Sequence, residues 1–287
     1  MKPWRLVANL GRRESRARGS RATAEIQGSY AHRLFERGRE FERIYAIGDL
    51  HGEFDLFREA LKVVNADNAS KPAARSTIIL LGDVVDRGPQ SKQLLQVLQQ
   101  FHTASTSFIV LRGNHEEMLL QSARGDEVMQ RLWLRSGGRQ TLESYGIDPD
   151  RFARRSPTER AEMLLAALGD ETLQWLDSRP LSYRSGSYYF CHAGVRPGVE
   201  LNKQVASDLL WIRNKFLYSD EDHGAVVVHG HTEVDSPEFL YNRINIDTAA
   251  HKSGRLSVIG MQGTDLWLLS VSADTRNTKT TVQKLIV

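Results

Sequence analysis

The stretch RIYAIGDLHG at residues 43–52 joins a run of apolar and β-branched residues to a polar cluster flanked by glycines. Residues 43–48 predict a buried strand, because a short apolar run bounded by turn residues is typical of a strand covered on both faces. The same pattern returns in TIILLGDVVDRG at residues 77–88 and in FIVLRGNHE at residues 108–116. We therefore expect three buried strands, each ending in a polar cluster.

Helical patterns separate these strands. Apolar residues between 53 and 64 recur with the spacing of one helical face, and so do those between 89 and 101. A helix is also expected from about His115. The order β-α-β-α-β predicts parallel strands covered by helices.

The rest of the chain changes character twice. Residues 117–180 are charged and helical in pattern, and we interpret them as a helical insertion or cap within a single domain over 43–287. Short strands are then expected at 183–191, 225–229, 243–247, 254–260 and 265–271. The fold class is therefore α/β, with a strand-rich final third.

Composition excludes several classes of protein. Of 287 residues, 40% are hydrophobic and 25% are charged, which is ordinary for a globular domain and excludes collagen, coiled coil and wholesale disorder. Cys191 is the single cysteine, so an intrachain disulfide cannot form, which fits a reducing cytoplasm. No apolar run approaches the roughly 20 residues needed to span a bilayer.

The basic character of the chain is concentrated at its beginning. The net charge is +3, but residues 1–24 alone carry +6, which leaves −3 for the remainder. We interpret residues 1–42 as a basic, solvated N-terminal arm. An organelle transit peptide and an electrostatic tether to RNA or anionic lipid are alternatives, so the arm is the part that would contact acidic partners.

The polar clusters hold metal-ligand types. In open α/β sheets, sites form beyond the carboxyl ends of the strands. The candidate ligands are Asp49, His51, Asp83, Asn114, His192 and either His229 or His231. Carboxylate, imidazole and amide donors suit Mn²⁺, Fe or Zn²⁺, and one cysteine excludes a cysteine-rich zinc site. Six ligands with a carboxylate free to bridge are enough for two metals, the arrangement used for in-line displacement at phosphorus.

The series GDLHG, GDVVDRG, GNHE, HAG and GHT, spread over residues 48–232, resembles the PPP-type, calcineurin-like metallophosphoesterases. That family includes Ser/Thr phosphoprotein phosphatases, phage lambda phosphatase and bacterial diadenosine tetraphosphatases. The resemblance implies a β-sandwich of two mixed sheets flanked by helices. It also implies two divalent metal ions, with Mn²⁺ favoured over Fe or Zn²⁺.

The resemblance assigns a role to each matching residue. Asp49 and His51 would hold the first metal, Asp83 would bridge both, and Asn114, His192 and His231 would hold the second. His229 would then support the site from behind or simply end a strand. The remaining matches are His115 as general acid, Asp86 as the carboxylate that orients it, and Arg87, Arg112 and Arg213 as phosphate contacts. A hydroxide bridging the metals would attack phosphorus in line.

The same motifs bear on the substrate. GNHE and Gly-His-Thr resemble protein phosphatases, whereas the tetraphosphatases carry GNHD and Gly-His-Trp forms. We therefore expect a phosphoserine or phosphothreonine protein as substrate, with a dinucleoside polyphosphate as the alternative. A non-catalytic binding protein on the same fold is a third reading. We expect Asp247 to be scaffold, His251 to be an ordinary core or surface residue, and residues 117–180 to act as a lid, a substrate platform or packing alone.

Overall fold

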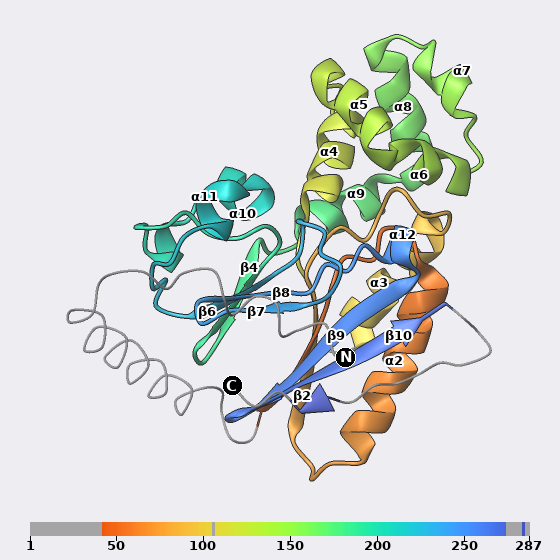
Figure 1. The fold of residues 1–287 in the computed structure, drawn as a ribbon. Coiled ribbons are helices and arrows are strands. Elements are labelled where there is room, and N and C mark those ends of the chain that lie inside the picture. The colour runs from red at the N-terminus through yellow and green to blue at the C-terminus, as the bar shows by residue number, and fades with distance from the viewer. Residues whose placement is uncertain (1–41, 105–106, 274–282, 285–287) are drawn as a thin grey trace, which may run out of the picture.

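The computed structural model describes residues 42–104, 107–273 and 283–284. The arm expected over residues 1–42 lies outside the described residues, except for Glu42. Within the described part of the chain, no helix has the length and apolar character that crossing a membrane requires. These residues form two mixed β-sheets surrounded by helices, as the resemblance implies (Figure 1).

The first sheet contains the three strands that open the sequence pattern. In spatial order it consists of β11 (Gln283–Lys284), β10 (Asp265–Ser272), β9 (Arg255–Gln262), β1 (Glu42–Ile47), β2 (Arg75–Leu80) and β3 (Phe108–Val110). β1, β2 and β3 are parallel, while β9 is antiparallel to β1 and to β10. The helices α2 (Phe54–Ala69) and α3 (Ser91–Ala104) connect the parallel strands. The predicted β-α-β-α-β order is confirmed.

The second sheet is built from the strand-rich final third. In spatial order it consists of β4 (Ser182–Ser185), β5 (Tyr188–Cys191), β6 (Val226–His229), β8 (Arg243–Asn245) and β7 (Glu238–Phe239). β5, β6 and β8 are parallel neighbours. The expected strand segment 183–191 is a hairpin, because Gly186 turns the chain with a φ of 55°. The edge strand β7 is too short to leave a periodic signal in the sequence.

The two sheets pack face to face. Side chains of β1 alternate between the layers: Ile44 and Ala46 join an apolar cluster with Phe190 and Val228 of the second sheet. Tyr45 and Ile47 point the other way, into the cluster beneath the helices that cover the first sheet. Because β1 is buried on both faces, residues 44–47 form an unbroken apolar run.

Residues 117–180 are helical, as predicted, and form the group of helices at the top of Figure 1. The segment consists of α4 (Asn114–Ala123), α5 (Glu127–Trp133), a turn kinked at Gly137 (Leu134–Gly138), α6 (Arg139–Ser144), α7 (Pro149–Ala153), α8 (Pro157–Leu168) and α9 (Asp170–Asp177). Local capping explains several boundaries. The Ser156 hydroxyl accepts a hydrogen bond from Glu159 N at the start of α8, and Pro157 occupies the first turn, where its missing N–H costs nothing.

Short helices cover the outer face of the second sheet and the loop after β8. They are the 3₁₀ turn Leu201–Lys203, α10 (Ala206–Trp211), α11 (Asn214–Leu217) and α12 (Ala250–Ser253). Phe216 of α11 and Leu209 of α10 pack on Val227 of β6. The parallel strands of each sheet present their carboxyl ends together. The two sets of ends meet, because His231 N, after β6, donates to Asp49 Oδ2, after β1, at 3.0 Å.

Candidate dinuclear metal centre

The loops at this edge hold unusual backbone conformations. Among the described residues, the non-glycine residues with positive φ are His51, Asp83, Asp86, Arg87, His231 and Ala249. All but Ala249 are residues that the sequence analysis assigns to the site. A non-glycine residue in this region is strained and persists only where its surroundings hold it, and such residues cluster at functional sites.

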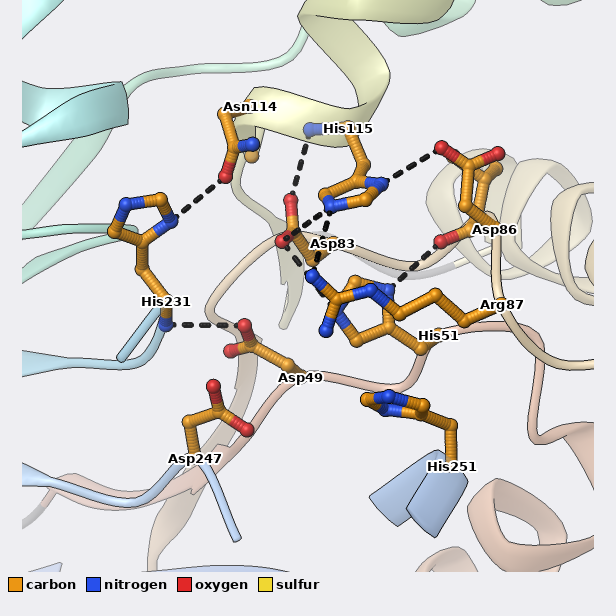
Figure 2. A network of polar contacts seen from close by, with 12 residues as sticks. Asp49, His51, Asp83, Asp86, Arg87, Asn114, His115, His231, Asp247 and His251 are labelled. Carbon is orange, nitrogen blue, oxygen red and sulfur yellow. Dashed lines mark hydrogen bonds and ion pairs between the residues drawn. The ribbon is translucent and has the colours of Figure 1, made fainter. Parts of the chain in front are cut away.

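Asp83 lies at the centre of the cluster (Figure 2). Its carboxylate belongs to two groups whose ligand atoms lie within 4.8 Å of one another, one with His51 and His115 and the other with His192 and His231. His51 Nε2 lies 3.6 Å from Asp83 Oδ2, and His192 Nε2 lies 3.3 Å from Asp83 Oδ1. One carboxylate shared by two donor groups has the form of a bridging ligand between two metals.

Asn114 and Asp49 stand beside these groups. Asn114 Oδ1 lies 2.8 Å from both His192 Nε2 and His231 Nδ1. Asp49 belongs to neither group of potential ligands; its Oδ2 accepts from His231 N at 3.0 Å. A Cβ on Gly230 would collide with the Asp49 carboxylate, so only glycine allows this approach. The structure therefore gathers all six predicted ligands but places His115, rather than Asp49, with His51.

The electrostatics of the cluster fit divalent cations. Asp49 Oδ1 and His231 Nε2 are buried without a hydrogen-bond partner. Burial and the neighbouring Asp247 raise the pKa of Asp49 well above its ordinary value. Burial also raises the pKa of Asp247 to about 6. Bound cations would coordinate these unpartnered oxygen and nitrogen atoms. They would also offset the repulsion between the crowded buried carboxylates.

Backbone carbonyls orient two of the imidazoles. His51 Nδ1 lies 3.1 Å from Val85 O, and His192 Nδ1 lies 3.0 Å from Leu81 O. A proton on each Nδ1 donates to the carbonyl and leaves Nε2 turned toward Asp83. Hydrogen bonds of this kind fix the tautomer and ring orientation of metal-binding histidines.

His229 and His231 occupy different surroundings. His231 lies in the cluster, and burial lowers its pKa well below the ordinary value. His229 is fully buried at the end of β6, with its ring centroid 5.0 Å from that of Phe216 beneath α11. Burial likewise lowers the pKa of His229 to about 3. This arrangement favours His231 as the ligand and His229 as a neutral core side chain.

His115 and Asp86 form a close buried pair next to Asp83. His115 Nδ1 lies 2.7 Å from Asp86 Oδ2, and both side chains are at most 2% exposed. Burial opposes the charged imidazolium, but the carboxylates of Asp83 and Asp86 outweigh it and raise the pKa of His115. The pair can therefore keep a proton on an imidazole beside the metal-ligand cluster, as a general acid requires.

The three arginines predicted to contact phosphate all contact other side chains of this protein. Arg87 Nη1 pairs with Glu233 at 2.8 Å, and its Nη2 lies 3.3 Å from His115 Nε2. Arg112 Nη1 lies 3.0 Å from the Asp177 carboxylate of α9. Arg213 is exposed and reaches Thr232 Oγ1 at 3.3 Å. Arg87 is thus beside the acid pair, while Arg112 is drawn toward the helical segment.

Glu116 has a structural role that the sequence analysis did not assign. Its buried carboxylate accepts hydrogen bonds from Asp83 N, Val84 N and Gly113 N at 2.8–2.9 Å. Burial raises its pKa to about 7. Glu116 therefore holds the strained Asp83 loop against the start of α4. Glu116 stands three residues after the N-cap Gly113 and accepts from its N–H, which is the glutamate half of a capping box, and this spacing is the signal that could have found it.

His251 also lies beside the ligand cluster, and no sequence pattern indicated that it would lie there. Its ring centroid lies 5.0 Å from that of His51, and its Nε2 lies 3.8 Å from Glu233. It enters from α12, so only tertiary structure brings it here (Figure 2). Cys191, by contrast, is buried in β5, and burial raises the pKa of its thiol, so it is a core residue.

Residues 42–259 match the family model described as calcineurin-like phosphoesterase. The chain belongs to this family. It is 30% identical to serine/threonine-protein phosphatase 2 of Escherichia coli over 76% of this chain and 92% of that protein. It is 32% identical to the symmetrical bis(5'-nucleosyl)-tetraphosphatase of Methylococcus capsulatus over 54% of this chain, and there the match spans only 44% of the relative's length.

A solved structure described as a putative diadenosine tetraphosphatase superposes with a TM-score of 0.57. The match covers 82% of this chain and 95% of that one, at 18% identity, and so it bears on the fold alone. The family and its phosphatase-named relatives support a hydrolase acting on phosphoric esters. Relatives of two substrate classes match this calcineurin-like phosphoesterase, so family membership leaves the substrate open.

Proposed function

We propose that this phosphoesterase hydrolyses phosphomonoesters with the help of two divalent cations. The observation that carries the proposal is the Asp83 carboxylate, which belongs to two potential ligand groups and lies beside the buried His115–Asp86 pair. This juxtaposition provides for a nucleophile on one side of a phosphoryl group and a proton donor on the other, as in-line displacement requires.

The candidate ligands are Asp49, His51, Asp83, Asn114, His192 and His231. Bound cations would supply positive charge for the phosphoryl oxygens and lower the pKa of a water molecule. Mn²⁺ suits the mixed carboxylate, imidazole and amide donors, as Fe and Zn²⁺ also do.

The protein's own groups would then serve the leaving side of the reaction. In its acid form His115 would carry a proton on Nε2, while its Nδ1–H donates to Asp86 Oδ2. When water adds to phosphorus and the ester P–O bond breaks, the leaving oxygen takes the Nε2 proton. Arg87, next to His115 Nε2, would exchange its Glu233 contact for a phosphoryl oxygen, because a guanidinium fork matches phosphate geometry.

We further propose a phosphoserine or phosphothreonine protein as the substrate. The support is the extent of similarity, since the match to a Ser/Thr protein phosphatase spans 92% of that relative. The GNHE motif adds little, because Glu116 is 1% exposed and uses its oxygens on backbone amides. An exchange between glutamate and aspartate at position 116 would therefore alter the hydrogen bonds to the loop and would leave substrate contacts unchanged.

Dinucleoside polyphosphate hydrolysis is the second candidate. It is favoured by matches to symmetrical bis(5'-nucleosyl)-tetraphosphatases at 31–32% identity. Those matches span less than half the length of each relative, so more than half of each relative lies outside the region that aligns with this chain. The metal cluster would serve either reaction, because both need the same attack and charge stabilisation.

A side-by-side rate comparison tests both proposals. Turnover would be measured with Mn²⁺ on a phosphoserine or phosphothreonine peptide and on diadenosine tetraphosphate. The His115→Asn protein, purified in the same way, controls for contaminating phosphatases. We expect kcat/KM to favour the peptide by at least about tenfold. The reverse preference would establish the second candidate. Absent turnover on both substrates and on p-nitrophenyl phosphate would favour the non-catalytic reading. Turnover that needs no metal would contradict the proposed metal-dependent mechanism.

A further inference from the structure

The second oxygen of Asp86 is held by the helical segment. Asp86 Oδ2 faces His115, while Asp86 Oδ1 accepts from Trp133 Nε1 at 2.9 Å and from Thr141 Oγ1 at 2.6 Å. All four side chains are buried, at 0–2% exposure. A carboxylate whose two oxygens are engaged by fixed partners cannot rotate freely, so the direction of its hydrogen bond to His115 is set.

Thr141 also holds the backbone of Asp86. Asp86 N donates to Thr141 Oγ1 and to Ser91 Oγ, each at 3.0 Å. Asp86 has a φ of 73°, a conformation that its surroundings must maintain. One hydroxyl group therefore accepts from the strained main chain of Asp86 and donates to its carboxylate.

A kinked turn centred on Gly137 brings the two donors together. Trp133 ends α5 and Thr141 lies in α6, with the turn Leu134–Gly138 between them. Gly138 lies so close to the Trp133 indole that a Cβ would collide with it. Gly137, with a φ of 116°, passes Arg87 equally closely, and its carbonyl accepts from Arg87 N at 3.0 Å.

We infer that Trp133 and Thr141 are positioning residues for the Asp86–His115 acid pair, so that the helical segment forms one wall of the catalytic apparatus. The inference rests on the acid role proposed for His115. The indole N–H and the threonine hydroxyl fix Asp86 Oδ1, Asp86 Oδ2 fixes His115 Nδ1–H, and His115 Nε2 then faces the leaving oxygen. Second-layer hydrogen bonds of this kind decide whether a catalytic group is held within the needed geometry.

The kinetic test uses Thr141→Val, which removes the hydroxyl but keeps a β-branched shape, with Thr141→Ser as its matched control. Turnover with Mn²⁺ would be measured on phenyl phosphate and on p-nitrophenyl phosphate, whose leaving group needs little protonation. We expect Thr141→Val to lose about tenfold more kcat on phenyl phosphate than on p-nitrophenyl phosphate, and Thr141→Ser to stay close to wild type. Equal losses on the two esters would overturn the positioning role.

Trp133→Phe gives a second variant, since it removes the indole N–H while keeping an aromatic ring beside Phe152. It should show the same preference for the better leaving group. Proportional losses on both esters would mean that the indole serves packing alone.

A spectroscopic test does not depend on turnover. In ¹⁵N-histidine-labelled protein, the Nδ1–H signal of His115, assigned by its absence in His115→Asn, should persist in Thr141→Ser and shift or broaden in Thr141→Val. An unchanged signal in Thr141→Val would overturn the inference. Wild-type protein without Mn²⁺-dependent turnover would contradict the proposed function alone, because the proton signal reports the positioning directly.

Discussion

The candidate site has two halves, which are built from different parts of the chain. The metal half consists of the six candidate ligands, and the acid half consists of His115 and Asp86 with the residues that hold them. The candidate metal ligands lie in short loops after parallel strands of both sheets or, for Asn114, at the first residue of α4, each within a few residues of its strand. The acid half is completed across long sequence distances, because Asp86 receives Trp133 from 47 residues away and Thr141 from 55. Local strand-end motifs thus supply the candidate ligands, whereas the helical segment supplies the hydrogen bonds that hold the proposed acid pair.

Asp83→Asn should have the largest effect, because Asp83 is shared by both ligand groups. Burial opposes its ionisation, but the imidazoles of His192, His115 and His51 hold its pKa well below the ordinary value. The amide should lower the metal content below two ions per chain and reduce turnover roughly a thousandfold, the scale of several kcal/mol. Elemental analysis and p-nitrophenyl phosphate turnover measure the two effects. Asp170→Asn, the same change at an exposed position of α9, is the control, and unchanged metal stoichiometry in Asp83→Asn would contradict the bridging role.

His115→Asn tests the boundary between the two halves. His115 Nε2 lies 3.8 Å from Asp83 Oδ2, and yet its Nδ1 is engaged by Asp86. If His115 is the proton donor, the His115→Asn substitution should reduce turnover by about 10²–10⁴-fold and leave the metal content intact. A large fall in metal content would instead move His115 into the metal half, as a ligand with His51.

The pH profile should distinguish the acid half further. Asp86 raises the pKa of His115, and a general acid works only while it is protonated. Turnover should therefore fall as the pH rises through the pKa of His115. Asp86→Asn removes one of the charges that raise this pKa, so the alkaline limb of the profile should move to lower pH. A limb that stays in place would assign it to another group.

His229→Ala should have the smallest effect on activity. His229 packs against Phe216, outside both ligand groups, so its loss should cost about 1–3 kcal/mol of unfolding free energy and leave metal binding unchanged. Urea unfolding and elemental analysis measure this. His231→Ala, two residues away, should lose metal under the same conditions. Metal loss in His229→Ala would reverse the assignment of the two histidines.

The β-α-β-α-β order along the chain, the helical segment and the gathering of the six candidate ligands could be predicted from the sequence. Each ligand follows an apolar run closely, and strand-end geometry then brings the runs together. The candidate metal ligands could be predicted because the sequence signal for each of them is local. The positive φ values of His51, Asp83 and Asp86 had no such signal, since they are imposed by the surrounding loops.

The features that escaped prediction depend on tertiary contacts. His251 reaches His51 from α12, a helix of four residues with no periodic pattern. Arg112 turns toward Asp177 because the chain returns from α9 beside β3, where Arg112 N donates to Pro180 O. The contacts of Trp133 and Thr141 with Asp86 likewise appear only once the kink at Gly137 has brought α5 and α6 against Asp86.

The number of Mn²⁺ ions bound per chain tests the central claim most directly. The protein would be stripped with a chelator, re-equilibrated with Mn²⁺, freed of excess metal and assayed by elemental analysis. Two buried ligand groups sharing Asp83 predict two ions per chain. A protein that binds no Mn²⁺, or only one ion per chain, and is still fully active on p-nitrophenyl phosphate would contradict the account.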